Sequence, residues 1–577
     1  MTRGTRAALA AALGAVLVVP LSVTATTASW NDREWAHGAP LGTGSIACDG
    51  TTAFDTVSRG TFLAGELLGV DLDAIAALEE MRLTVDADGT ATPSPGGAID
   101  LGSTPPTYTY ANPFDVTALG IVGVDLTGLA VPIGAATLGG VSQWTQGSTS
   151  GDTAGAAGLI NDSGAVLVSD STPSDELPAP GTIDITALLP PVAGLDDATL
   201  EVGAVAASSQ LDGCAALREQ IWGIAPATPA VTRDYGIASL GLVIDAPVIG
   251  ALTGGVTTGV GELEAAVAAL VGQDGLISQT LRTNLDLVVP GVTAASLTGT
   301  VEITGLDLNA VVAPFLGITL DGNGFTIDLA NGRILVDVEH LTGSLNNAGP
   351  NTELVLNAAV INDIIAEAGV LLDAWVQDVT DALRDAIRDA QLTIDLSTTV
   401  SAIGLELASV TLVLDATIGE VLDGTATIAV TATALGGLPA TIDILLGAAG
   451  LPTLSDILSA LTGSGGALTS ALANLLTSEL LDRVTTLGAT LSTLSTPVVN
   501  VVAGVLNALP TVVSVMVNVQ PDQAGAPPGS SFIAAGPQST AEYAVTALRL
   551  GLADFAVPGD VAHVRFGTGS AGPVTLP

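Results

Sequence analysis

The spacing of apolar residues changes near residue 235, and this change constrains the fold more than any single motif does. Over residues 29–234, short apolar runs are broken by Gly, Pro, Asp and Ser. Such runs are typical of strands in a sandwich of antiparallel sheets. Over residues 235–519, longer stretches with helical spacing alternate with pairs of strands. The sequence therefore predicts a mainly β fold with helices (α+β), in which a β-sandwich-like N-terminal domain precedes a central α+β domain.

In the first region we expect strands at Met81–Val85, before an Asp88-Gly89 turn, and at 165–169 and 199–206. A short helical piece is expected at 72–80. Tryptophans are concentrated here and are expected to anchor the core. They are Trp30, Trp35, Trp144 and Trp222.

The clearest helix of the central region is predicted over residues 363–390, with Asn362 as its N-cap. Its apolar residues recur at steps of three and four and form one stripe. A helix on a membrane surface needs Lys and Arg on its polar face, whereas aspartate dominates here, so we expect packing on a sheet. Strands at 392–400, 405–414 and 425–434 and apolar helix between Leu454 and Leu509 are expected to follow.

The last part of the chain, residues 520–577, begins with a linker rich in Pro, Gly and Ser (QPDQAGAPPGSS, 520–531). A β-like segment follows at 541–572. Its ALRLGLADF stretch resembles ATLEVGAVA of the first region in texture. We therefore expect this tail to pair with the first domain, which makes the central domain an insertion.

The chain contains no lysine, and its 14 arginines against 58 acidic residues give a net charge of −44. Nothing in such a chain neutralises a phosphate backbone, which excludes nucleic acid as a partner. The absence of lysine also excludes a Walker A loop, Schiff-base chemistry and lysine–asparagine isopeptide crosslinks. The charge results from scarce cations, since the acid content itself is ordinary.

Residues 1–28 have the pattern of a signal peptide. Arg3 and Arg6 precede a short apolar run and then small residues, with cleavage expected after Ala25 or Ala28. Because the arginines are not adjacent, the general secretory route is expected. The protein is then extracellular or on the cell surface.

No transmembrane anchor is expected after signal cleavage. The longest uncharged stretch, residues 484–521, is interrupted by Pro497, Asn500, Asn507 and Pro510. These residues suit buried helices and strands better than a membrane-spanning helix.

The two cysteines, Cys48 and Cys214, are expected to form a disulfide in an exported protein, the alternative being two free thiols. His37, His340 and His563 show no ligand spacing. No metal site and no cofactor are therefore expected.

No motif indicates catalysis. The glycines at 567, 569 and 572 match a nucleotide-binding pattern, but no helix can follow them so near the last residue. The DADG and DGNG sequences (86–89 and 321–324) are interpreted as hairpin turns rather than calcium loops. Among 58 acidic residues no pair stands out, so we expect no enzyme and predict no catalytic residue.

Four segments in a fixed order carry a family resemblance: SRGTFLAGELLGVDLDAIAAL (58–78), NPFDVTALGIVGVDL (112–126), SQWTQGSTSGDTAGAAGLINDSGAVLV (142–168) and ATLEVGAVAASSQLDG (198–213). In these the chain resembles the choice-of-anchor G family, exported surface proteins mostly of high-GC Gram-positive bacteria (actinobacteria). The resemblance is strongest over 30–235 and continues loosely to EYAVTALRLGLADF. Members often carry a sortase motif, but no complete LPxTG is present here, so the resemblance does not predict covalent attachment to the wall.

The sequence thus predicts an exported bacterial surface or secreted protein with a structural or interaction role, with cell-wall or surface components as partners. Two other hypotheses remain open. A secreted carbohydrate-active hydrolase would place two carboxylates in a cleft and raise the pKa of one. A module that binds hydrophobic ligands would enclose an apolar cavity in the central region.

Overall fold

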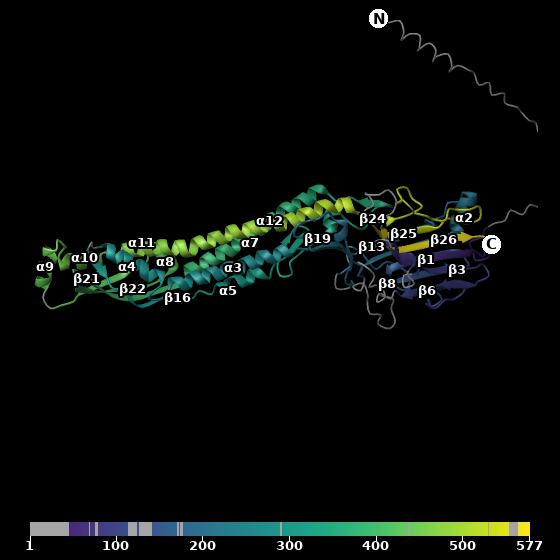
Figure 1. The fold of residues 1–577 in the computed structure, drawn as a ribbon. Helices are drawn as coiled ribbons and strands as arrows, with labels where there is room; N and C mark the ends of the chain where they lie inside the picture. Colours follow the sequence, from purple (N-terminus) through teal and green to yellow (C-terminus); the bar gives the residue numbers. More distant parts are fainter. Residues whose placement is uncertain are drawn as a thin grey trace, which may run out of the picture. The chain divides into compact units, whose positions relative to one another are not determined.

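The computed structural model describes residues 46–67, 70–74, 79–113, 124–125, 141–169, 172–173, 177–288, 291–436, 439–528, 530–552 and 563–577. The expected signal peptide, Trp30, Trp35 and His37 lie outside these residues. The described part combines antiparallel sheets with helices, which confirms the α+β class (Figure 1).

Two antiparallel sheets pack face to face as a sandwich. Sheet 1 contains, in spatial order, β20 (Thr352–Leu354), β24 (Val513–Val519), β25 (Tyr543–Leu552), β26 (His563–Thr575), β1 (Asp55–Leu67), β3 (Met81–Val85) and β4 (Ala91–Ser94), with β2 (Val70–Asp71) beside β1. Sheet 2 contains β13 (Val231–Ile237), β12 (Val205–Asp212), β9 (Asp152–Leu159), β8 (Val141–Ser148), β6 (Thr107–Pro113) and β5 (Ile99–Asp100). The strands β1 and β26 contact β9 across the interface.

Glycines bring the two sheets unusually close at the centre of the sandwich. A Cβ atom added to Gly155 on β9 would lie 2.0 Å from the carbonyl oxygen of Arg59 and 2.4 Å from that of Ser570. Likewise, a Cβ on Gly569 would lie 2.3 Å from the Gly155 carbonyl oxygen. Packed sheets usually stand about 10 Å apart with side chains between them. At these glycines the backbone of sheet 1 contacts the backbone of sheet 2.

The last described strand, β26, pairs with the first, β1. β26 lies between β25 and β1, with Arg59 opposite Ser570 and Thr61 opposite Thr568 (Figure 1). The part of the chain from β14 (Leu240–Asp245) to α12 (Asp482–Val512) is therefore inserted between strands of one sandwich, and among its described strands β20 alone joins sheet 1.

Two further sheets lie beside the sandwich: sheet 4 is formed wholly by the inserted part, whereas sheet 3 also includes three strands that precede it in sequence. Sheet 3 contains β17 (Thr319–Gly322), β18 (Phe325–Asp328), β19 (Arg333–Asp337), β14 (Leu240–Asp245), β11 (Asp197–Val202), β10 (Gly181–Asp184) and β7 (Val124–Asp125). Sheet 4 contains β15 (Val292–Ala294), β21 (Gln391–Ala402), β22 (Leu405–Thr417) and β23 (Ala429–Ala434), with β16 (Thr298–Thr304) beside β21. β11 pairs with β14, so this sheet joins strands from both sides of residue 235, where the spacing of apolar residues changes.

Three long helices form the centre of the inserted part: α3 (Pro247–Leu270) and α7 (Ala358–Asp389) both contact α12 (Asp482–Val512). The shorter helices are α2 (Gly213–Trp222), α4 (Leu276–Val288), α5 (Leu308–Leu316), α6 (Val338–Thr342), α8 (Ile418–Leu422), α9 (Pro439–Ala448), α10 (Leu454–Thr462) and α11 (Gly465–Leu476), with a π-helical turn at Thr477–Leu481 and 3-10 turns at Leu72–Ala74 and Thr186–Leu188. Apolar side chains of the helices from α3 to α12 and of sheets 3 and 4 form one continuous core, which extends into the sandwich through residues such as Phe62 and Phe566.

By length and composition, one helical run among the described residues, Gly465–Val512, is apolar enough to cross a membrane. Core helices of globular proteins pass the same test. In this fold Val484, Leu491 and Val498 on that run have no exposed surface because they pack into the protein core.

Several sequence-based predictions are confirmed at the level of elements. Met81–Val85 is β3, and the pair predicted at 392–400 and 405–414 is the β21–β22 hairpin. The amphipathic helix is α7, whose apolar stripe is buried, but it packs mainly against α12 and not against a sheet as predicted. Trp144 is buried, and its indole N–H donates to the Asp162 carbonyl at 3.2 Å.

Other predictions are wrong in detail. Helix α7 begins at Ala358 and is capped by Asn357, whose side chain accepts a hydrogen bond from the Ala359 N–H, not by Asn362. No strand forms at 165–169, where Val166 makes only an isolated bridge to Ile160. The helical piece at 72–80 is a 3-10 turn over Leu72–Ala74 in its described part, and Trp222 is 41% exposed on α2.

Candidate functional site

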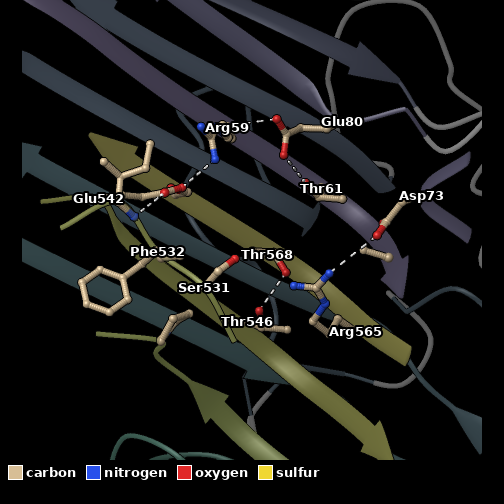
Figure 2. A pocket seen from close by; sticks show the side chains of 15 residues that line it. Arg59, Thr61, Asp73, Glu80, Ser531, Phe532, Glu542, Thr546, Arg565 and Thr568 are labelled. Atoms are coloured by element: carbon tan, nitrogen blue, oxygen red, sulfur yellow. Dashed lines mark hydrogen bonds and ion pairs between the residues drawn. The ribbon is translucent and has the colours of Figure 1, made fainter. Parts of the chain in front are cut away.

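A polar pocket of about 450 Å³ lies on the face of sheet 1 that points away from sheet 2 (Figure 2). Strands β1, β25 and β26 supply its floor, and the linker that contains Ser531 and Phe532 supplies part of its rim. Side chains alternate between the two faces of a strand. The register that turns Gly60 and Gly569 toward sheet 2 therefore turns Arg59 and Ser570 into this pocket. We call it the Arg59–Arg565 pocket, after the arginines that line its two ends.

Glu542 holds the Arg59 end of the pocket together. Arg59 Nη1 donates to Glu542 Oε1 at 2.9 Å, and Ser570 Oγ donates to the same oxygen at 2.8 Å. The Ile533 N–H donates to Glu542 Oε2 at 3.3 Å, which ties the linker to the sheet. The Glu542 side chain is only 8% exposed, so its charge is almost entirely satisfied within the protein.

A second carboxylate, Glu80, lies on the other side of Arg59. Its Oε1 is 3.6 Å from Arg59 Nε, and the Thr61 hydroxyl donates to Oε2 at 3.5 Å. Burial raises the pKa of Glu80, the nearby arginines Arg59 and Arg82 oppose this, and repulsion from Glu542 adds to it. The pocket thus contains the pair of carboxylates and the raised pKa that a hydrolase would need.

The raised pKa of Glu80 predicts a pH dependence of stability. Because the folded protein binds this proton more tightly than the unfolded chain does, stability should fall as pH rises above the ordinary value of 4.5. In Glu80→Gln this contribution is absent, so the variant should gain stability relative to the native protein over that interval. Urea midpoints measured between about pH 4 and pH 7 check this. Asp378→Asn, an exposed carboxylate on α7, serves as the control. Parallel curves for the native protein and Glu80→Gln would contradict the prediction.

The Arg565 end of the pocket is less fully bonded. Arg565 Nη2 is 3.8 Å from Asp73 Oδ2, too long for a hydrogen bond. Its Nε is buried and has no hydrogen-bond partner within the part of the chain that the structure describes. Asp73 itself accepts from the Gly65 N–H at 3.3 Å. Because the Arg565 side chain is 39% exposed and its contact with Asp73 is too long for a hydrogen bond, the terminal nitrogens of its guanidinium can donate to a ligand.

Hydroxyl groups and one aromatic ring occupy the space between the two ends. Thr546 and Thr568, directly opposite each other on β25 and β26, share a hydrogen bond of 2.8 Å between their hydroxyls. Phe532 is 40% exposed at the rim. Arg565 pairs with Ala64, five residues along β1 from Arg59, which corresponds to about 16 Å. The pocket is thus a hydroxyl-lined trough with a guanidinium at each end.

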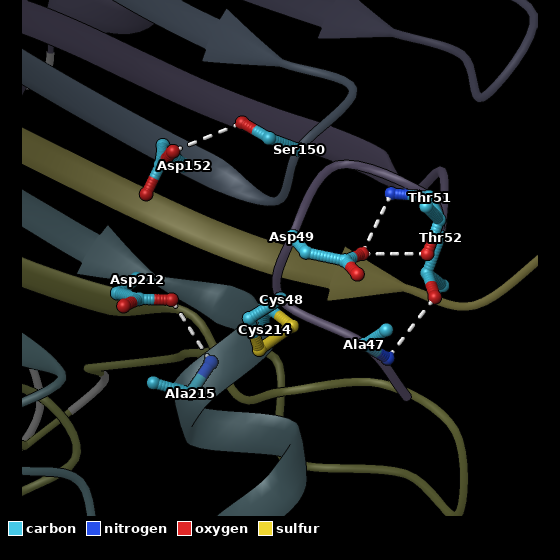
Figure 3. The surroundings of a disulfide bond; sticks show 10 residues. All are labelled: Ala47, Cys48, Asp49, Thr51, Thr52, Ser150, Asp152, Asp212, Cys214 and Ala215. Carbon is cyan, nitrogen blue, oxygen red and sulfur yellow. Dashed lines mark hydrogen bonds between the residues drawn. A yellow bond between two sulfur atoms is a disulfide. The ribbon is translucent and has the colours of Figure 1, made fainter. Parts of the chain in front are cut away.

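Cys48 and Cys214 form a disulfide with a Cα–Cα distance of 5.7 Å (Figure 3). Cys48 lies in the turn before β1, and Cys214 lies in the first turn of α2, where Asp212 caps the helix by accepting from the Ala215 N–H. The bond attaches the first described residues to the sandwich. Among the described residues no cluster of three or more His, Cys, Asp or Glu side chains is placed to hold a metal ion.

The other sequence patterns have structural roles. The glycines at 567, 569 and 572 lie on β26, where Gly569 faces sheet 2. The DADG and DGNG sequences form the turns of the β3–β4 and β17–β18 hairpins, as predicted. Sequence reasoning did not find the pocket. The one sequence signal that could have pointed to the pocket is the scarcity of arginine: with 14 cations in the chain, each arginine is a candidate for a specific role.

Fold and pocket together define an α+β protein whose sandwich is closed by its own C-terminal strands and carries a charged, hydroxyl-lined trough on one outer face. A family model described as a domain of unknown function (DUF8394) matches residues 58–572. The chain belongs to this family. No curated protein and no solved structure matches it.

Proposed function

We propose that the protein is an exported bacterial protein, on the cell surface or secreted, that acts by binding rather than by catalysis. The disulfide supports an oxidising compartment outside the cytoplasm. The signal-like residues 1–28 and the resemblance to choice-of-anchor G proteins support export by the general secretory route. Neither nucleic acid nor a transmembrane anchor has a part in this role.

The observation that carries the binding role is the Arg59–Arg565 pocket. The terminal nitrogens of Arg565, whose side chain is 39% exposed, suit a carboxylate, which a guanidinium can bind through two parallel hydrogen bonds. The threonine hydroxyls and Glu80 suit the hydroxyl groups of a sugar, and the exposed ring of Phe532 suits the apolar face of one. The ligand class that fits is therefore an acidic saccharide of the kind found in surface polymers.

Arg565→Gln should lower affinity for an oligosaccharide that contains glucuronate by about tenfold or more, because a charge-assisted bidentate contact is lost. Calorimetric titration of the full chain checks this, with a neutral oligosaccharide of the same length as the reference ligand. Arg333→Gln on sheet 3, which removes an exposed arginine paired with Asp245, is the matched control and should leave affinity unchanged. Equal affinity for the acidic and neutral ligands would sink the proposal.

Location is tested separately by cell fractionation combined with thiol alkylation before and after reduction. An exported protein is found outside the cytoplasm with Cys48 and Cys214 protected from alkylation until it is reduced. A protein found only in the cytoplasm, with both thiols reactive, would contradict the assignment.

A second candidate function, hydrolysis of a glycosidic bond, is favoured by one observation: the raised pKa of Glu80 in a pocket that also contains Glu542. Against it, three donors bind the Glu542 carboxylate, which suits a fixed structural anion better than a nucleophile or a base. Release of reducing ends from a bound polysaccharide by the native protein but not by Glu80→Gln would establish the hydrolase.

The third hypothesis, a module for hydrophobic ligands, stays a prediction. The apolar side chains of α3, α7 and α12 pack against one another in the core, and the pocket of about 610 Å³ between α3 and α12 is lined by Glu262, Arg483 and three threonines as well as by apolar groups.

A further inference from the structure

Exposed apolar side chains gather where β21 turns into β22, at one end of sheet 4. Strand β15 follows α4 and pairs with β21, with Val292 opposite Ala402, so the end of α4 lies at this end of the sheet. The Leu435 N–H donates to the Leu407 carbonyl, so the segment that leads from β23 to α9 lies at the same end (Figure 1). We call this set the apolar tip. It consists of Leu287, Ile403, Leu405, Ile444 and Leu445.

The degree of exposure at the apolar tip is high for residues of this type. Leu287 is 73% exposed, Ile444 is 72% exposed and Ile403 is 52% exposed. Single exposed apolar residues are common on protein surfaces, but a gathered set marks a contact surface.

Charge is excluded from the same region. The segments 287–301, 396–405, 424–442 and 444–455 contain no acidic or basic residue. Two acidic residues adjoin these segments, and the carboxylate of each accepts a hydrogen bond from a backbone N–H. Asp286 accepts from the Ala294 N–H at 2.5 Å, and Asp443 accepts from the Leu454 N–H at 2.8 Å. Glu406, which is exposed on β22, marks the margin of the apolar tip.

The hairpin turn itself indicates that the apolar tip has a use other than folding. Ile403 and Gly404 both have positive φ, 49° and 80°. This conformation is costly for a β-branched residue, and two-residue hairpin turns of this kind normally take Asn-Gly. The fold would therefore be better served by asparagine, whereas the chain places an exposed isoleucine there.

We propose that the apolar tip docks on a lipid bilayer with electrically neutral head groups by inserting these side chains shallowly. The choice of occupant follows from charge. A net charge of −44 opposes the approach of a second copy, and the tip, unlike the Arg59–Arg565 pocket, offers no arginine to an anionic group. A neutral bilayer accepts apolar side chains without a charged partner.

The test is flotation of the full chain with phosphatidylcholine vesicles. Binding is expected, it should persist in 1 M salt, and adding phosphatidylglycerol should weaken it. Ile444→Asp should lower vesicle affinity by about tenfold or more, since it replaces an inserted side chain by a charge. Val370→Asp on α7, which is also exposed (66%) but lies outside the apolar tip, is the matched control and should bind as the native protein does.

Ile403→Asn separates docking from a structural role. Asparagine tolerates positive φ, so this variant should melt at a higher temperature while binding vesicles several-fold more weakly. A residue kept only for packing would give a lower melting temperature. The proposal is overturned if the native chain does not float with phosphatidylcholine vesicles or if the tip variants bind unchanged. A native dimer that Ile444→Asp dissociates would also overturn it, because the apolar tip would then be a self-association surface.

Discussion

Gly155→Ala should destabilise the protein by more than about 3 kcal/mol, enough to leave much of the sandwich unfolded. The added methyl group would meet the carbonyl oxygens of Arg59 and Ser570, two neighbouring residues of β1 and β26 that are paired with each other. Neither oxygen can move away without disturbing the ladder between those strands. The φ of Gly155 is not positive, so the cost arises from the close approach of the sheets and not from backbone strain.

Urea unfolding followed by circular dichroism measures this effect. Gly254→Ala in α3 is the matched control, because an added Cβ there meets nothing within 4 Å. In a helix this change should stabilise the protein by up to about 1 kcal/mol, so the two glycine variants are expected to move in opposite directions. A small and equal change in both variants would mean that the sheets are not in backbone contact.

The second large effect concerns the disulfide. The double variant Cys48→Ala, Cys214→Ala should lose about 2–5 kcal/mol of unfolding free energy, because the bond joins residues that are 166 positions apart in sequence. Cys214, in the first turn of α2, is almost fully buried, and alanine at that position leaves no reactive thiol.

Urea midpoints with and without a reducing agent measure the contribution of the disulfide. Reduction should bring the native protein to the stability of the double variant and should leave the variant itself unchanged. If reduction shifts both proteins equally, the effect does not come from this bond.

Periodicity was sufficient to predict the long helix and the hairpin that follows it. The apolar stripe of α7 is continuous, and both strands of the β21–β22 hairpin alternate between buried and more exposed positions. The start of the helix could not be predicted from sequence, because Asn357 and Asn362 are equally suited to cap a helix. In the structure Asn357 is the cap. The apolar run at 165–169 satisfied the pattern of a strand, but Val166 makes only an isolated bridge to Ile160.

The Arg59–Arg565 pocket was beyond sequence reasoning for a different reason. Arg59 and Glu542 are separated by 483 positions, and their contact depends on the exact register of β26 with both β1 and β25. A shift of one residue would turn Arg59 toward sheet 2 and Gly60 outward. The likeness of ALRLGLADF to ATLEVGAVA was sufficient to suggest that the tail pairs with the first domain, but it could not give the register between the paired strands.

The place of β26 also sets the order in which the sandwich can be completed as the chain is synthesised. The strand β1 is among the first described segments to be made, and the edge of β1 that pairs with β26 stays open until residues 563–575 follow. Pairs such as Asp55 with Thr575 make closure of this sheet a long-range and therefore slow step, with an exposed strand edge in the meantime. The inserted part, which needs neither end of the chain for sheet 4, is free to fold during that interval.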